Sequence, residues 1–246
     1  MVNPIPSPIK ALFASLLLVA FTTGVGFAAP SPTPSGNREY ILLSGGPSIL
    51  VWEKWKSQPH DLWWQNFIRA AEIRITELKS QGVPASQITW FVYRIAYETR
   101  SKQEGQNLVA NINTLSNSLG VKLKYFSRSA QVIDYLNAGQ PRSLVPIADL
   151  EYFGHSNKAC WMFDYSNFID SASKVWIHED ELHKLAPGIF ARDAFIKSWG
   201  CHTGESMSQK FRRATGVRMW GATGRSQYMT HELPVLADPA SSRWRH

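Results

Sequence analysis

Residues 150–156 read LEYFGHS and residues 194–201 read AFIKSWGC. In each stretch an apolar run stops at a glycine and is followed by one reactive side chain, His155 in the first and Cys201 in the second. The pattern predicts two buried strands whose last residues emerge at the carboxyl edge of a sheet, where open α/β sheets place their sites. We therefore expect His155 and Cys201 to share one site.

The residues after Cys201 predict a helix and then a further strand. Apolar side chains recur at helical spacing over residues 207–214, Gly216 closes the helix, and residues 217–222 form the strand. A cysteine beside a helix N-terminus has a lowered thiol pKa, and the thiolate is the nucleophilic form. A histidine nearby can act as its base. The pattern therefore predicts a Cys–His pair.

These segments, taken together, resemble a known family. The letters FGH at 153–155, WGCHTG at 199–204, TGV at 215–217 and WGA at 220–222 are similar to the caspase-hemoglobinase fold of cysteine peptidases, which holds caspases, legumains, gingipains and self-processing toxin domains. The resemblance covers residues 38–230. It implies an α/β fold, the caspase-like three-layer sandwich in which helices flank a mostly parallel sheet.

The same resemblance implies roles for three residues. Cys201 is expected to attack a scissile carbonyl carbon and His155 to protonate the leaving amine, while the N–H groups of Cys201 and Ser156 hold the oxyanion. The family has a glycine where this chain has Ser156, so this position is a departure. The expected partner is a protein or peptide substrate, and no cofactor or metal is implied.

Strand and helix patterns alternate in the first half of the folded part. Short β-branched or aromatic runs predict strands, and apolar residues at helical spacing predict helices. The predicted strands are 40–43, 88–93 and 121–126, and the predicted helices are 61–79, 108–119 and 129–139. Strands separated by helices pair in parallel through right-handed crossovers. This half therefore supports the α/β class.

Two features of this half are assigned to structure and not to function. Gly45-Gly46 follows the first strand but lacks the rest of a phosphate-binding motif, so it predicts a turn. Aromatic residues at helical spacing are usually core residues, and we expect core packing rather than substrate or carbohydrate binding for a group of four. The group consists of Trp52, Trp55, Trp63 and Trp64.

The N-terminal segment differs in kind from the rest. A lysine precedes the apolar run 11–21, and small residues follow it, which predicts a secretory signal peptide over residues 1–29. An uncleaved membrane anchor is the alternative, although the run is shorter than the ~20 residues that a span needs. We expect a Pro/Ser-rich linker at 30–37, one peptidase domain at 38–246, and a secreted or periplasmic protein without a stable membrane span after leader cleavage.

The composition fits one folded and basic domain. Hydrophobic residues make up 44% of the chain, enough for a core, and the formal net charge is +7. The charges are scattered apart from Lys210, Arg212 and Arg213 on one predicted helix, which favours a solvated face. No nucleic-acid-binding motif is present, so we expect no nucleic-acid partner.

The two cysteines offer alternatives to the dyad. In an oxidising compartment Cys160 and Cys201 can form a disulfide. A zinc site from His155, Cys160, Cys201 and His202 is a further alternative, although the ligand spacing matches no familiar pattern. The second functional hypothesis is accordingly a catalytically silent caspase-like binding or structural module with a Cys160–Cys201 disulfide.

The segment between His155 and Cys201 carries further polar candidates. Residues 160–164 predict a strand or hairpin, and residues 178–182 begin a short helix with acidic residues in its first turn. Three histidines rival His155 as the base, but none follows a glycine at a strand end; they are His178, His183 and His202. Three acids close in sequence to the site can recognise a basic substrate residue or be paired internally. They are Asp149, Glu151 and Asp164.

Overall fold

The computed structural model describes residues 36–53, 64–170 and 172–246. The expected signal peptide and all but the last two residues of the expected linker lie outside these residues, as do Trp55 and Trp63. Among the described residues, no helix is both long enough and apolar enough to cross a membrane.

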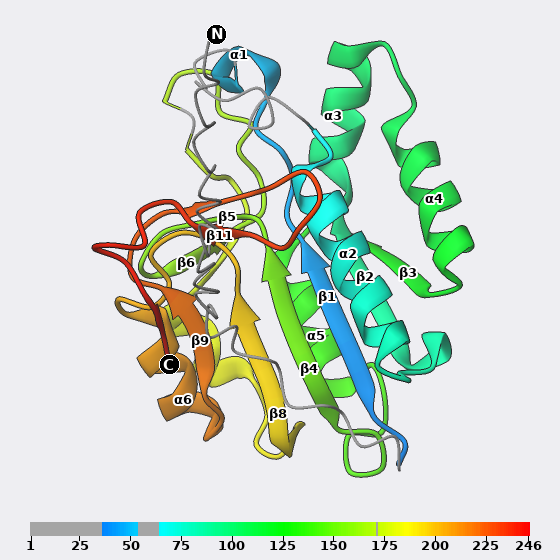
Figure 1. The fold of residues 1–246 in the computed structure, drawn as a ribbon, viewed down its shortest axis with the longest axis vertical. Coiled ribbons are helices and arrows are strands. Elements are labelled where there is room, and N and C mark those ends of the chain that lie inside the picture. The colour runs from blue at the N-terminus through cyan, green and yellow to red at the C-terminus, as the bar shows by residue number, and fades with distance from the viewer. Residues whose placement is uncertain (1–35, 54–63, 171) are drawn as a thin grey trace, which may run out of the picture.

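A seven-stranded sheet forms the centre of the molecule (Figure 1). In spatial order its strands are β12 (Trp244–Arg245), β9 (Met219–Ala222), β8 (Phe190–Ser198), β4 (Ile147–Phe153), β1 (Glu39–Ser44), β2 (Ile88–Tyr93) and β3 (Lys122–Phe126). All neighbouring pairs are parallel except β12 with β9, which are antiparallel. The sheet is therefore mixed but mostly parallel.

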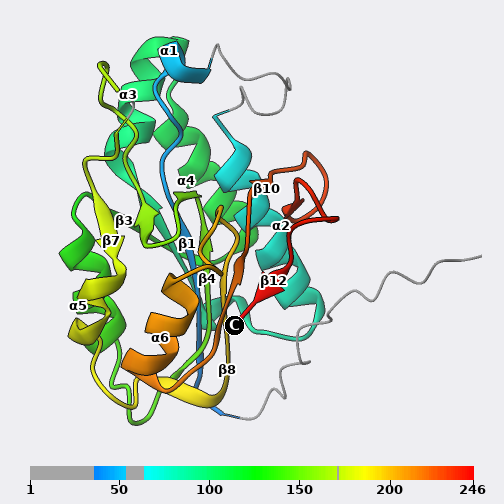
Figure 2. The same cartoon turned by 90° about the vertical axis from the view of Figure 1, so that its left-hand side faces the viewer.

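Helices cover both faces of this sheet (Figure 2). One face is packed by α2 (Asn66–Ser80) and α4 (Leu108–Leu119), with α3 (Arg94–Glu104) beside α4. The other face is packed by α5 (Ser129–Ala138) and α6 (Met207–Thr215). This arrangement confirms the expected α/β class and its three layers of helix, sheet and helix.

The sequence of β1 shows why it lies at the centre. All six of its residues, EYILLS, are buried. Tyr40 and Leu42 belong to the core under α2 and α4, whereas Ile41 and Leu43 belong to the core under α5 and α6. Alternate side chains of a strand point to opposite faces, so a sheet covered on both faces needs a continuous apolar strand.

Shorter elements follow the carboxyl ends of the main strands. Leu50–Glu53 form α1 after β1. A three-stranded antiparallel sheet contains β5 (His155–Ser156), β6 (Cys160–Met162) and β7 (Trp176–His178), and a second small sheet pairs β10 (Ser226–Gln227) with β11 (Val235–Leu236). The strand expected at 160–164 is shortened to β6. The helix expected from 178 is a 3-10 helix, Glu179–Lys184.

The strand order creates a crevice at β1. The chain runs from β1 to β2 and β3 on one side, then returns to β4 on the other side of β1. Such a reversal leaves the carboxyl ends of the two strands uncovered, and ligands bind there in open α/β sheets. Here the Gly45 N–H donates to the Phe153 carbonyl oxygen at 2.8 Å and fixes the loop after β1 against the end of β4.

Candidate active site

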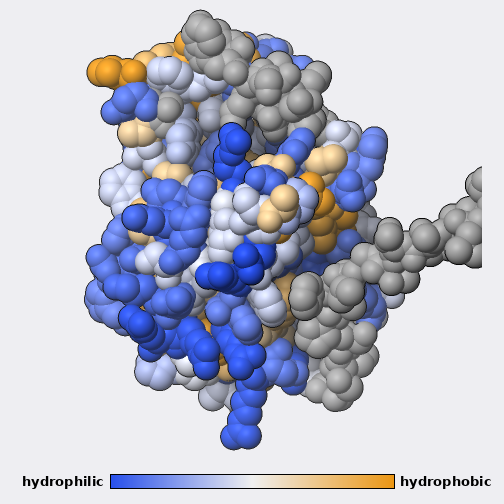
Figure 3. Space-filling view, turned by 60° about the vertical axis from the view of Figure 1, so that its left-hand side comes forward, coloured by the Kyte–Doolittle hydropathy of each residue, from blue (hydrophilic) through white to orange (hydrophobic). Residues whose placement is uncertain are grey.

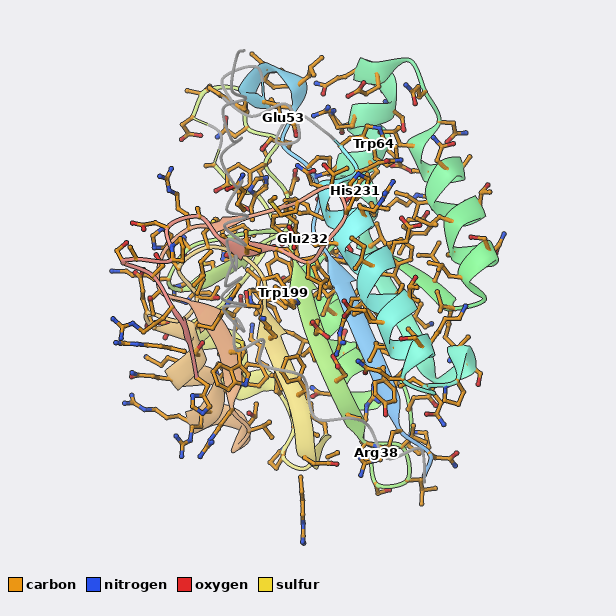
Figure 4. All side chains as sticks on the ribbon, in the orientation of Figure 1. Arg38, Glu53, Trp64, Trp199, His231 and Glu232 are labelled. Atoms are coloured by element: carbon orange, nitrogen blue, oxygen red, sulfur yellow. The ribbon has the colours of Figure 1, made fainter. Side chains whose placement is uncertain are left out.

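A pocket opens at this crevice and contains both predicted reactive residues. It is lined from the loops after β1, β4, β8 and β9 and from the start of α2, and its empty volume of about 580 Å³ includes space open to solvent. Its lining residues are Pro47, Ser48, Glu53, Trp64, Asn66, Phe67, Gly154, His155, Cys201, Ser226 and Tyr228. Figure 4 labels Glu53 and Trp64 near the top of the molecule and Trp199 at the upper end of β8. His155 and Cys201 thus share one pocket.

The His155 ring is held by three neighbours. Its Nε2 is hydrogen-bonded with the Ser48 hydroxyl at 3.2 Å. The ring of Phe67 meets it edge-on with centroids 5.0 Å apart, and the ring of Tyr165 lies at 4.6 Å. Phe67 comes from α2 and Ser48 from the loop after β1, so the orientation of the imidazole depends on elements far apart in the sequence.

The sulfur of Cys201 faces Ser226. The backbone N–H of Ser226 donates to Sγ at 3.4 Å, and the Ser226 hydroxyl oxygen lies 3.7 Å from Sγ. The same hydroxyl donates to the Trp199 carbonyl oxygen at 2.7 Å and so fixes Ser226 to the end of β8. The thiol in turn lies 3.8 Å from the Ser226 carbonyl oxygen, so the position of the sulfur is fixed by one residue of the segment after β9.

This arrangement corrects the expectation that a helix N-terminus faces the sulfur. Helix α6 begins only at Met207, and its first N–H groups donate to other carbonyl oxygens. Met207 N–H donates to Lys158 and Ser208 N–H to Thr203. The backbone N–H that donates to the sulfur thus comes from Ser226 and not from the first turn of α6.

Ser156 is bound to the segment that carries Cys201. Its hydroxyl donates to the Cys201 carbonyl oxygen at 2.7 Å. Gly200 is needed beside it, because a Cβ at that position would lie 2.1 Å from the Ser156 Oγ. The ends of β4 and β8 are therefore held together by the Ser156 hydrogen bond and by the close packing of Gly200 against Ser156.

The backbone N–H of Ser156 points away from the neighbouring strand β6. The Asn157 N–H donates to the Cys160 carbonyl oxygen, and Ser156 pairs with Trp161 in the β5–β6 ladder. Hydrogen-bonded and non-hydrogen-bonded pairs alternate in an antiparallel ladder, so Ser156 occupies a non-hydrogen-bonded position and directs its N–H outward from β6. Ser156 itself is not among the lining residues of the pocket, although its neighbour His155 is.

Cys160 lies outside the pocket that contains Cys201. Burial, followed by the charges of Glu179, Glu181 and Asp180, raises the pKa of the Cys160 thiol to about 11. Both cysteines are free, so the expected alternative of a Cys160–Cys201 disulfide is wrong. Cys160 is held on β6 opposite His178, whereas Cys201 follows β8 and faces Ser226.

The zinc alternative finds no ligand set in the part of the chain that the structure describes. No three His, Cys, Asp or Glu residues gather there in a way that could hold a metal ion. Of the four proposed ligands, His155 and Cys201 line the pocket, while Cys160 and His202 do not. The four side chains therefore do not line one site.

The rival histidines have local partners and do not line the pocket. His178 accepts from the Asp180 N–H at 3.1 Å and caps the 3-10 helix, and His183 is hydrogen-bonded with the Asp180 carbonyl oxygen at 2.6 Å. His202 contacts Glu205 at 2.6 Å and has a φ of +63°, a left-handed conformation uncommon outside glycine. That conformation turns the chain away from β8 just after Cys201.

The three acids expected near a basic substrate residue do not line the pocket and have internal partners. Arg74 contacts Glu151 and lies 3.1 Å from the nearest Asp149 carboxylate oxygen. Burial, with the neighbouring Glu151, raises the pKa of Asp149. Asp164 accepts from the Tyr93 hydroxyl at 3.0 Å. Asp149 and Glu151 occupy alternate positions of β4 and face Arg74 of α2, so the structure agrees with the second alternative, internal pairing, and not with substrate recognition.

Several lining residues were missed from the sequence. Ser48 follows the Gly45-Gly46 turn, and Trp64 was assigned to the core alone. Tyr228 accepts a hydrogen bond from the Gly154 N–H at 2.8 Å and packs against Phe67 with ring centroids 4.8 Å apart. The turn at Gly45-Gly46 was the only sequence signal that could have pointed to these residues. A loop that leaves β1 where the strand order reverses has to pass the site.

Fold and pocket together define an α/β protein with a cysteine and a histidine at the switch point of a mostly parallel sheet. No protein-family model matches the chain, and no match was found among the curated proteins or the solved structures. The resemblance to cysteine peptidases therefore rests on the sequence segments quoted above, and functional assignment rests on the pocket.

Proposed function

We propose that this chain is an exported cysteine endopeptidase of the caspase-hemoglobinase type, with His155 and Cys201 as its dyad. The observation that carries the proposal is that one pocket at the carboxyl edge holds both side chains. The Ser226 N–H on the sulfur and the Ser48 hydroxyl on the imidazole support it, because a nucleophile and a base both need fixed partners.

The first half of the reaction forms a thioester. The Cys201 thiolate attacks the scissile carbonyl carbon, a C–S bond forms, and the carbonyl electron pair moves onto oxygen. The N–H groups of Cys201 and Ser156 hold that oxyanion. The carbonyl then re-forms, the C–N bond breaks, and His155 gives its proton to the leaving amine.

The second half returns the enzyme to its starting state. Water attacks the thioester carbon while His155 takes one of its protons. The C–S bond then breaks, and the carboxylic acid product leaves with the oxygen of the water. Cys201 regains the thiolate and His155 holds the proton, so no external oxidant or reductant takes part.

Substitution of each cysteine tests this proposal. Cys201→Ala should abolish cleavage of a peptide library, whereas Cys160→Ala should keep most of it because the Cys160 thiol is protonated at neutral pH. His155→Ala should approach the loss of Cys201→Ala, since residues that act as one unit are not additive. Equal cleavage by wild type and Cys201→Ala would refute the dyad.

A silent binding module is the remaining alternative. Ser156 favours it, because its hydroxyl stands where the resembling peptidases carry a glycine. Alkylation with iodoacetamide distinguishes the two hypotheses. If the protein is a peptidase, Cys201 should be alkylated well before Cys160 in the folded protein. A Cys201 that resists alkylation until the protein unfolds would support the module.

A further inference from the structure

Positive charge is concentrated in the last part of the chain. Residues 207–246 contain seven Lys or Arg residues and two Asp or Glu residues, so they contribute 7 − 2 = +5 of the net charge of +7. The remaining 206 residues are close to neutral. The excess is therefore a local property of α6, β9, β12 and their connections.

The fold gathers these residues on one side of the molecule. Arg245 of β12 pairs with Gly221 of β9, and the next residue, His246, stacks on Trp220 with ring centroids 4.2 Å apart. The Arg218 guanidinium lies 3.1 Å from His246 Nε2. In Figure 4 nitrogen-tipped side chains radiate from α6 and the C-terminus, and the corresponding face in Figure 3 is predominantly blue in its lower half.

Acidic neighbours do not neutralise the arginines of this face. Lys210 lies 3.7 Å from an Asp180 carboxylate oxygen, but no ion pair between described residues involves the exposed arginines, which are Arg212, Arg213, Arg218, Arg225, Arg243 and Arg245. By contrast, the buried Arg74, Arg100 and Arg142 all have carboxylate partners. Burial, followed by the charges of Arg218 and Arg212, lowers the pKa of His246.

The chemistry of the face favours phosphate groups as its ligand. Guanidinium groups bind phosphate in a forked, bidentate geometry, and the face carries arginine almost exclusively, with Lys210 as the exception. Strongly exposed large apolar side chains lie elsewhere, and none is on α6, β9 or β12. Contact with a surface would therefore be electrostatic, without insertion of apolar anchors.

A nucleic acid fits the face less well than a membrane. Single strands bind through exposed aromatic rings on which bases stack, whereas Trp220 is already covered by His246. The expected leader also directs the protein to a compartment where bilayers are the abundant phosphate surfaces. We propose that the basic face formed by α6, β9 and β12 binds the surface of an anionic phospholipid bilayer.

The position of the face keeps the pocket accessible on a bound protein. In Figure 1 α6 and the C-terminus lie at the lower left, whereas the carboxyl ends of β1 and β4 point upward. The inference is independent of the proposed peptidase activity, because none of the pocket residues belongs to α6, β9 or β12.

Vesicle sedimentation of the full chain tests the proposal. The protein should bind phosphatidylglycerol-containing vesicles at low salt, with weak binding to neutral phosphatidylcholine vesicles, and salt should release it. A variant with Arg212→Ser, Arg218→Ser and Arg245→Ser should bind at least about tenfold more weakly, since each basic residue near an anionic surface adds several-fold to binding. The neutral vesicles report any binding by the apolar N-terminal segment, which all variants share.

The matched control removes the same number of charges near the opposite edge of the sheet, where β3 lies. Lys102→Ser, Lys122→Ser and Arg128→Ser are exposed positions on or beside α3, β3 and α5, and this variant should stay within about twofold of wild type. Equally weakened vesicle binding by both variants would mean that binding depends only on net charge, and would overturn the proposal. The proposal would also be overturned if the wild-type protein did not bind the vesicles. It would likewise be overturned if the protein bound an oligonucleotide through these arginines more tightly than the vesicles at the same salt concentration. If the first variant unfolds, Arg213→Glu alone serves the same comparison.

Discussion

The hydroxyl of Ser156 joins the two predicted strand ends. Its backbone N–H, which the proposed mechanism needs, is retained in any substitution except proline. Ser156→Ala and Ser156→Gly both remove the donor to the Cys201 carbonyl oxygen. Each should lower the free energy of unfolding by about 0.5–1.5 kcal/mol, because a part-buried acceptor loses its partner. Peptide turnover should persist in both. A large loss of turnover without a loss in urea stability would assign the hydroxyl a direct role in catalysis.

Lys197 makes stability depend on pH. Its Nζ lies 3.3 Å from the Trp199 ring centroid, and burial lowers its pKa from 10.5 to about 7. Between these values the unfolded chain binds a proton that the folded chain does not, so stability rises with pH in this window, by at most about 1.4 kcal/mol per pH unit. The buried charge therefore destabilises the fold most fully below the folded-state pKa.

Lys197→Met removes this pH dependence while keeping the length of the side chain. The variant should exceed wild type in urea stability at neutral pH, and the difference should shrink as the pH approaches 10.5. Urea denaturation at several pH values gives both curves. Parallel curves for the two proteins would show that Lys197 keeps an ordinary pKa in the fold.

Prediction from sequence succeeded for residues whose signal is local. His155 and Cys201 each follow a glycine at the end of an apolar strand, and the structure places both in one pocket. Their contacts Ser48 and Ser226 carry no such signal, because they reach the site through loops that follow other strands. Only the strand order, which periodicity does not reveal, brings them together.

Among the elements, length and amphipathic period decided what could be predicted. The main strands are apolar runs, α2, α4, α5 and α6 have a clear helical period, and the bounds of these elements differ from prediction by a few residues. The sequence of α3, RIAYETRSKQE, is largely polar and buries only Ala96, Tyr97 and Arg100, so no apolar period marks it. Strands of two or three residues, such as β5 and β12, are too short to show alternation.

The partly buried edge of the short strand β12 is formed by Trp244. Its ring packs edge-on against Trp199 with centroids 5.4 Å apart, and the ladder with β9 contains two residue pairs. Trp244→Ala should cost about 2 kcal/mol of unfolding free energy, from the apolar area that it exposes. Trp176 is 43% exposed on β7, so Trp176→Ala is the control and should cost well under half as much. Equal losses in urea denaturation would contradict this role of Trp244.

On the scale of the whole molecule, the pocket lies between a rigid centre and a loosely attached margin. Part of its lining, Ser48 and Gly154, follows directly on β1 and β4, whose residues are almost completely buried. Its opposite wall holds Ser226 and Tyr228, which belong to the segment around the two-residue strands β10 and β11. Amides in buried central strands exchange slowly with solvent, whereas segments with few backbone contacts open easily.

Hydrogen exchange before and after alkylation of Cys201 tests this division. A group attached to the sulfur lies against Ser226, so a peptide-like thiol reagent should slow exchange across residues 224–237 by bridging them to the end of β8. Exchange in β1 and β4 should stay unchanged, because their amides already open only with the whole sheet. The same reagent on Cys201→Ala provides the control. Uniform protection of the entire chain would instead indicate global stabilisation, and the segment after β9 would then not be a separately opening wall of the pocket.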